Sequence, residues 1–130
     1  MEPEGVVHVL RRLLEALVPG GFVVDLTMSP PDEIVASGGE VLGRHDGSLF
    51  FPRALAAGAG LDELAEERVL ELTREEDVTV IVRYPSGQDV LEDITGRAFT
   101  RLPEELAARL APIRVECLLY SNCSVRTFRR

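Results

Sequence analysis

Residues 9–26 read Val-Leu-Arg-Arg-Leu-Leu-Glu-Ala-Leu-Val-Pro-Gly-Gly-Phe-Val-Val-Asp-Leu, and this stretch decides the fold class. Its leucines recur at intervals of three and four residues, which predicts an amphipathic helix over 6–18. Pro19 cannot continue a helix, and the two glycines after it permit a tight turn. The apolar run that follows predicts a strand over 22–28, buried on both faces.

Turn residues divide the rest of the chain into short segments. Ser29-Pro30-Pro31-Asp32 predicts the end of the first strand, because two prolines fit neither a helix nor a central strand. The pair Gly38-Gly39 predicts a hairpin that joins 33–36 to 40–45. The remaining predicted elements are a helix over 52–66 interrupted near Gly58 and Gly60, a hairpin of 69–74 with 78–84, helices over 88–96 and 102–110, and a strand over 113–130 that either continues past Asn122 or turns there.

The order of these segments predicts a single domain over residues 1–130 of the α/β class. We expect a mixed, half-Rossmann-like sheet with one parallel element, antiparallel hairpins and flanking helices. An α+β fold is the alternative.

Composition excludes several function classes. The formal net charge of −8 disfavours nucleic-acid and anionic-membrane partners, which require a positive surface. No apolar run approaches the ~20 residues of a membrane span, and the acidic start Met-Glu-Pro-Glu-Gly is unlike a signal peptide, so we expect a cytoplasmic protein. Cys117 and Cys123 are expected to be free structural thiols, and no His or Cys spacing predicts a metal site.

Residues 9–84 resemble the C-terminal half of a class I S-adenosylmethionine-dependent methyltransferase. In that family a helix leads through a Leu-x-Pro-Gly-Gly turn into the fifth strand, and Val18-Pro19-Gly20-Gly21 is similar to that turn. The family continues with a helix and a final antiparallel hairpin, for which 51–66 and 69–84 would stand. The chain has no acidic-x-Gly-x-Gly-x-Gly after a strand. The resemblance therefore implies that the cofactor-binding half is absent, and we expect no cofactor.

A half-fold of this kind has a physical consequence. Without the N-terminal half, one edge of Phe22–Leu26 would be unpaired and apolar, which favours aggregation. The hairpin over 33–45, the C-terminal strand or a second copy of the chain must cover it, and the last option predicts a homodimer. We therefore expect a non-catalytic binding or assembly module. The alternatives are a small enzyme with an acid/base site at the strand ends and an accessory subunit that completes a partner methyltransferase.

Four residues are candidates for ligand binding. Asp25 and Thr27 lie near the end of the first strand, where open α/β sheets bind ligands; pairing of Asp25 with an arginine is the alternative. A histidine beside a carboxylate, as in His45-Asp46, serves acid/base chemistry or metal binding. Adjacent residues of a strand point to opposite faces, so a solvent-exposed turn is the alternative for this pair. No catalytic residue is predicted.

Overall fold

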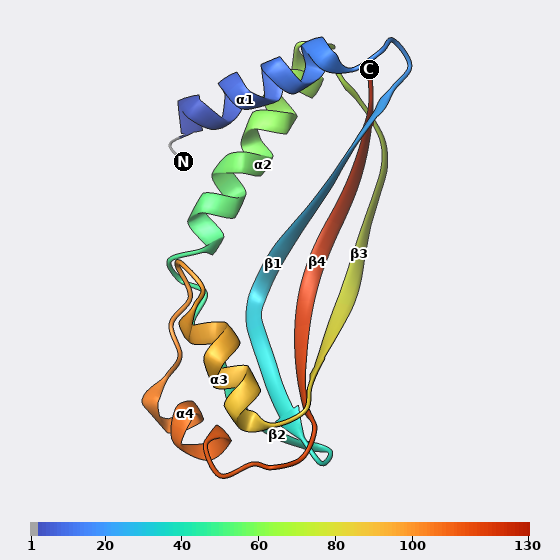
Figure 1. Cartoon of the computed structure of the whole chain (residues 1–130). Helices are drawn as coiled ribbons and strands as arrows, with labels where there is room; N and C mark the ends of the chain where they lie inside the picture. The colour runs from blue at the N-terminus through green and yellow to red at the C-terminus, as the bar shows by residue number, and fades with distance from the viewer. Residues whose placement is uncertain (1–2) are drawn as a thin grey trace. The chain divides into compact units, whose positions relative to one another are not determined.

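The structure, a computed structural model, describes residues 3–130 except for the side chains of 3, 4, 6 and 7 (Figure 1). Its helices are α1 (Pro3–Ala16), α2 (Phe51–Glu66), α3 (Gly87–Thr95) and α4 (Glu104–Leu110). Its strands are β1 (Phe22–Ser37), β2 (Glu40–Arg44), β3 (Glu71–Tyr84) and β4 (Cys117–Arg129). They form one antiparallel sheet in the order β2-β1-β4-β3 with flanking helices, which confirms the mixed α/β class. The parallel element expected from the sequence is absent from this sheet.

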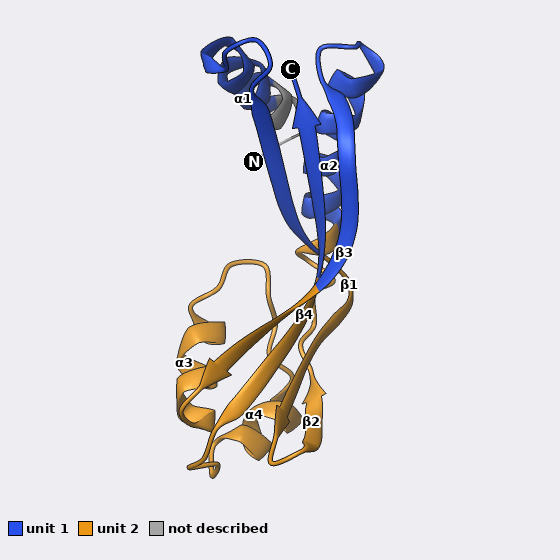
Figure 2. Ribbon diagram, turned by 90° about the vertical axis from the view of Figure 1, so that its right-hand side faces the viewer, with its two compact units in different colours: residues 1–28, 52–78, 123–130 blue, residues 29–51, 79–122 orange. Residues whose placement is uncertain are grey.

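The fold divides into two compact units (Figure 2). Unit 1 comprises residues 1–28, 52–78 and 123–130, and unit 2 comprises residues 29–51 and 79–122. Strands β1, β3 and β4 each contribute residues to both units. Each unit has its own apolar core, as described next.

In unit 1, α1 and α2 lie on one side of the strands (Figure 1). Of the predicted leucine stripe, Leu14 is in the core and Leu10 and Leu17 pack against it, whereas Leu13 is 57% exposed. The Arg130 guanidinium donates to the carbonyl of Leu14, in the last turn of α1, and to that of Leu17, just after the helix, where the carbonyls lack partners within a helix. The buried core residues of this unit are Leu14, Leu61, Leu64, Leu70 and Phe128.

In unit 2, α3 and α4 supply the apolar side chains that cover the strands. Ser86 caps α3, because its hydroxyl accepts the Asp89 N–H at 3.3 Å. Gly87 is required at the start of α3, since a Cβ there would lie 1.9 Å from the Leu110 carbonyl oxygen. The predicted helices 88–96 and 102–110 are confirmed, with slightly different bounds. The buried core residues of this unit are Val35, Tyr84, Val90, Ile94, Leu106, Leu110, Cys117 and Leu119.

The predicted hairpin between β1 and β2 is confirmed. Ser37 pairs with Glu40 across a two-residue turn. Gly38 and Gly39 both have positive φ, +59° and +80°, which is the backbone conformation that a type I′ turn requires. The register shifts by one residue next to Val35, so the strands are not paired regularly to their ends.

The predicted end of the first strand at residues 29–32 is wrong, because β1 continues to Ser37. Pro30 and Pro31 are exposed and precede Ile34, where pairing with β2 begins. Before Ile34 one side of β1 has no paired strand, so a missing N–H group on that side costs no ladder hydrogen bond. Proline is therefore tolerated there, as it is at sheet edges.

The predicted hairpin over 69–84 and the predicted interruption of the helix over 52–66 are also wrong. Residues 71–84 form the single strand β3, at the edge of the sheet, where Glu75, Glu76 and Asp77 are exposed to solvent. Of these three residues only Asp77 is of a type that favours turns, and no glycine, proline or asparagine accompanies it. Helix α2 is continuous through its glycines, and β4 continues past Asn122.

Core packing in unit 1 can be tested with two leucines of the same helix. Leu64 is 0% exposed and Leu55 is 68% exposed, and both lie on α2. We expect Leu64→Ala to lower the free energy of unfolding by about 2 to 5 kcal/mol, because it leaves a cavity. Leu55→Ala changes helix propensity equally and is expected to stay within about 0.5 kcal/mol of the unmodified protein. Urea denaturation followed by circular dichroism measures both, and equal losses would contradict this assignment of the core.

Candidate functional site

The structure places the four predicted residues in different units. Asp25 and Thr27 belong to unit 1, and His45 and Asp46 belong to unit 2. They are therefore described as two separate groups. For each group the sequence left two alternatives open, a ligand-binding or chemical role and a structural one. The contacts of each group distinguish between them.

Asp25 is held in a pairing with arginine. The Thr27 hydroxyl donates to Asp25 Oδ1 at 2.9 Å, and Arg126 Nε lies 3.5 Å from Asp25 Oδ2. The same guanidinium lies 2.5 Å from Asp62 Oδ1 and 5.2 Å from the centre of the Phe128 ring. Arg126 thus ties β4 to β1 and α2 through two carboxylates. Both oxygens of Asp25 are occupied by these contacts.

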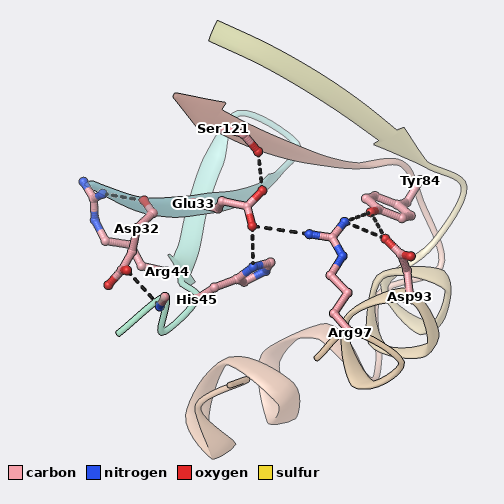
Figure 3. Close-up of polar contacts among 9 residues, drawn as sticks. Asp32, Glu33, Arg44, His45, Tyr84, Asp93, Arg97 and Ser121 are labelled. Atoms are coloured by element: carbon pink, nitrogen blue, oxygen red, sulfur yellow. Dashed lines mark hydrogen bonds and ion pairs between the residues drawn. The ribbon is translucent and has the colours of Figure 1, made fainter. Parts of the chain in front are cut away.

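His45 is buried, and its carboxylate partner is Glu33 rather than Asp46 (Figure 3). The His45 N–H donates to the Glu33 carbonyl at 3.0 Å, and the ring Nδ1 lies 3.3 Å from Glu33 Oε1. The register shift in the hairpin explains this pairing. Ala36 pairs with Val41 but Val35 pairs with Gly43, so one extra residue on β2 brings His45 opposite Glu33.

Asp46 occupies a turn, as the alternative reading of the sequence allows. Its Oδ1 accepts the Ser48 N–H at 2.9 Å, and the hydrogen bonds from Ser48 hold the pKa of Asp46 below its ordinary value. Its backbone exchanges hydrogen bonds of 3.0 and 3.1 Å with Arg101. The Asp46 side chain therefore supports the chain reversal after His45, and it does not contact the imidazole through any hydrogen bond described here.

Glu33 lies at the centre of a network of polar side chains, the Glu33 cluster (Figure 3). The Ser121 hydroxyl donates to Glu33 Oε2, and Arg97 Nη1 lies 3.3 Å from Glu33 Oε1. Arg97 also lies 2.8 Å from Asp93 Oδ2. The network joins β1, β3, α3 and β4, and its members are Glu33, His45, Tyr84, Asp93, Arg97 and Ser121.

Of this cluster, the sequence interpretation singled out only His45. A signal for Ser121 was present, because strand alternation puts it on the same face as Cys117 and Leu119. All three are buried. Glu33 precedes the apolar run Ile34-Val35-Ala36 and gave no comparable signal. Arg97 and Asp93 are four residues apart, the spacing at which helical side chains meet, but nothing in the chain linked them to Glu33.

The cluster determines which of its groups are charged. Burial raises the pKa of Glu33, but hydrogen bonds from His45 and Ser121 and the nearby positive charges outweigh burial and lower it. Burial raises the pKa of Tyr84 to about 12, helped by its hydrogen bond to Asp93. At neutral pH the cluster therefore contains an ionised Glu33 and a protonated Tyr84 phenol.

The contacts of the cluster favour a structural role over nucleophilic catalysis. Ser121 donates its hydroxyl to Glu33 rather than to His45, and the lowered pKa of Glu33 makes this carboxylate a weak base for activating a nucleophile. His45 Nε2 is buried and has no hydrogen-bond partner among the described residues. In the part of the chain that the structure describes, no group of three His, Cys, Asp or Glu residues is placed to hold a metal ion.

Each unit also presents apolar side chains at its surface, where they are more accessible than the buried polar groups described above. In unit 1, Phe22, Val24 and Leu26 are 58%, 64% and 63% exposed, so the prediction that this strand is buried on both faces is wrong. In unit 2, an open hollow of about 310 Å³ is lined mainly by apolar side chains. Its lining includes Ile34, Ala36, Val41, Leu118 and Tyr120.

Comparisons of the chain with models of protein families, with curated proteins and with solved structures find no match. Among the described residues, no helix combines the length and the apolar character needed to cross a membrane. Function is therefore inferred from the geometry of the two units themselves.

The charge of Glu33 predicts a pH dependence of stability. Because its folded pKa lies below the ordinary value of 4.5, ionised Glu33 stabilises the fold fully above that value. This stabilisation is lost as the pH falls from 4.5 through the folded pKa. We expect Glu33→Gln to cost about 1 to 3 kcal/mol at pH 7 and to weaken the dependence of stability on pH below 4.5. Urea titrations between neutral and acidic pH measure both effects.

The matched control for this variant is Glu105→Gln on α4. The Glu105 carboxylate is 78% exposed and pairs with Arg109 at 2.6 Å. Exposed ion pairs contribute little, so the control is expected to change stability by less than about 1 kcal/mol at any pH. Identical pH profiles for Glu33→Gln and the unmodified protein would contradict the assigned charge state.

Proposed function

We propose that this protein is a non-catalytic binding and assembly module that forms a homodimer through unit 1. The observation that carries this proposal is the row of Phe22, Val24 and Leu26 on β1, each more than half exposed. Alternate residues of a strand share a face, so these side chains form one continuous apolar row. Helices α1 and α2 pack against the opposite face, where Val23 meets the core (Figure 1).

Self-association is favoured by the chemistry of this row. Large apolar side chains grouped on a surface mark interaction sites, because leaving them in water is unfavourable. None of the three side chains of the row carries a charge, and charged residues are depleted at the centres of interfaces. A surface of this kind is compatible with a two-fold symmetric interface, in which both copies use the same residues.

The alternative is that the same apolar row binds another protein, to which this chain is an accessory subunit. The resemblance of residues 9–84 to the C-terminal half of a methyltransferase makes a methyltransferase-like chain the partner to try, and S-adenosylmethionine the first small molecule to titrate. In that case the isolated protein would be monomeric and would change mass only when the partner is co-expressed. The same mass measurement therefore separates the two roles.

Dimer formation can be tested by light scattering and sedimentation at tens of micromolar protein. We expect a mass twice the 14.3 kDa of the chain. Leu26→Glu is expected to raise the dissociation constant at least about tenfold, because it places an unpaired carboxylate in an apolar contact.

The matched control for Leu26→Glu is Leu55→Glu. Leu55 is 68% exposed in the same unit but lies on α2, outside the apolar row. This control adds the same charge at a comparably exposed leucine and is expected to leave the mass unchanged. A monomeric mass for the unmodified protein would overturn the proposed homodimer.

A further inference from the structure

We infer that two copies of the chain join edge to edge, with β1 of one copy antiparallel to β1 of the other and Val24 at the centre of the register. This inference rests on the proposed homodimer and specifies its geometry. It depends on three properties of residues 22–28 of β1, which are their open edge, the direction of their backbone groups and the position of Asp25, the only charged residue among them.

The first property is that β1 has an open side in unit 1. In the sheet order β2-β1-β4-β3, the only described neighbour of β1 on the side away from β4 is β2. Strand β2 pairs with β1 only over 34–37. Residues 22–28 therefore form one edge of the sheet of unit 1, and β3 forms the other edge (Figure 2).

These two edges differ sharply in charge. Natural sheets protect an edge from other strands with charged side chains. Five of the seven residues over 71–77 of β3 are charged, whereas Asp25 is the only charged residue over 22–28 of β1. The β3 edge is thus protected, and the β1 edge, with its apolar row, is suited to accept another strand.

The second property is the direction of the backbone groups. Gly21 uses its carbonyl to accept the Arg130 N–H at 2.9 Å, so it faces β4. Residues of an antiparallel strand turn their N–H and C=O groups alternately to the two neighbours. This alternation directs the backbone groups of Phe22, Val24 and Leu26 to the open edge. The residues that carry the apolar row are then also the residues that would form the new ladder.

The third property, the position of Asp25, selects the register. Centring the pair on Val24 places Phe22 opposite Leu26 of the second copy, an aromatic–aliphatic pair that stabilises sheets. Centring it on Asp25 would oppose two carboxylates, which is unfavourable. Centring it on Leu26 would oppose Phe22 to Pro30, which has no N–H to donate. Val24 is therefore the centre that uses the apolar row fully.

Asp25 itself is compatible with this register. It faces the helix side of the strand, where Arg126 and Thr27 already compensate its charge. In the Val24-centred pair its cross-strand neighbour is Val23 of the second copy. No like charges meet, and the occupant with the matching pattern is an identical strand, because each aromatic–aliphatic pair forms twice by symmetry.

Cysteine cross-linking tests the register directly. In the Val24-centred ladder the two Val24 Cα atoms form a hydrogen-bonded pair about 5.5 Å apart, within the range that a disulfide spans. We expect Val24→Cys to become a covalent dimer when diamide, a two-electron oxidant, joins the two thiols. The native Cys117 and Cys123 are buried, at 0% and 4% exposed, and do not compete.

Two matched variants serve as controls. The two Phe22 positions would be offset by four residues, about 13 Å along the strands, so Phe22→Cys is expected not to cross-link. Leu55→Cys, on α2, measures cross-linking by random collision. Cross-linking of Val24→Cys well above both controls, on a non-reducing gel, supports the register. If light scattering gives a dimer while Phe22→Cys cross-links instead, or Val24→Cys does not exceed Leu55→Cys, the register is overturned and the homodimer stands.

A charge pair provides a measurement that needs no thiol. Leu26→Glu weakens the dimer. Adding Phe22→Lys is expected to lower the dissociation constant of this variant at least about tenfold, because positions 22 and 26 face each other across the ladder. Adding Leu55→Lys instead changes the net charge equally and is expected to restore none. Equal recovery with both lysine variants would contradict the Val24-centred register, and a monomeric unmodified protein would contradict the proposed function itself.

Discussion

The shortness of β2 is the constraint from which the architecture of β1 follows. Strand β1 is sixteen residues long, but β2 pairs with only its last four. Over those four residues β1 is an inner strand, and Val35 is completely buried. Before them it is an edge, where two consecutive prolines are tolerated and three large apolar side chains remain exposed. One strand thus has two environments, which the similar apolar runs at its two ends, 22–26 and 34–36, do not distinguish.

In unit 2 the polar interior depends on one carboxylate. Glu33 receives hydrogen bonds from Ser121, His45 and Arg97, which come from β4, the residue after β2 and the residues after α3. A buried charge is costly unless it is compensated, and here the compensation comes from several elements. The carboxylate therefore makes the positions of these elements depend on one another.

The sequence predicted what is decided locally. The amphipathic helix α1 and the positive-φ glycines of the β1–β2 turn depend on residues close together in the chain, and the structure confirms both. The strand through Pro30-Pro31 and the unbroken β3 could not be predicted, because a strand's tolerance for proline or charge depends on whether it is an edge. The partnership of His45 with Glu33 was missed for a related reason. It depends on a one-residue register shift that no local pattern marked.

That register shift makes the length of β2 as decisive as its composition. Val35 and Gly43 are partners only because β2 carries one residue more than regular pairing would require. With regular pairing Arg44, which is exposed, would take the place opposite Glu33, and the imidazole would turn to the outer face of the hairpin. The number of residues in β2 thus decides which side chain is buried beside Glu33. An insertion or deletion in this strand would replace His45 there with another residue.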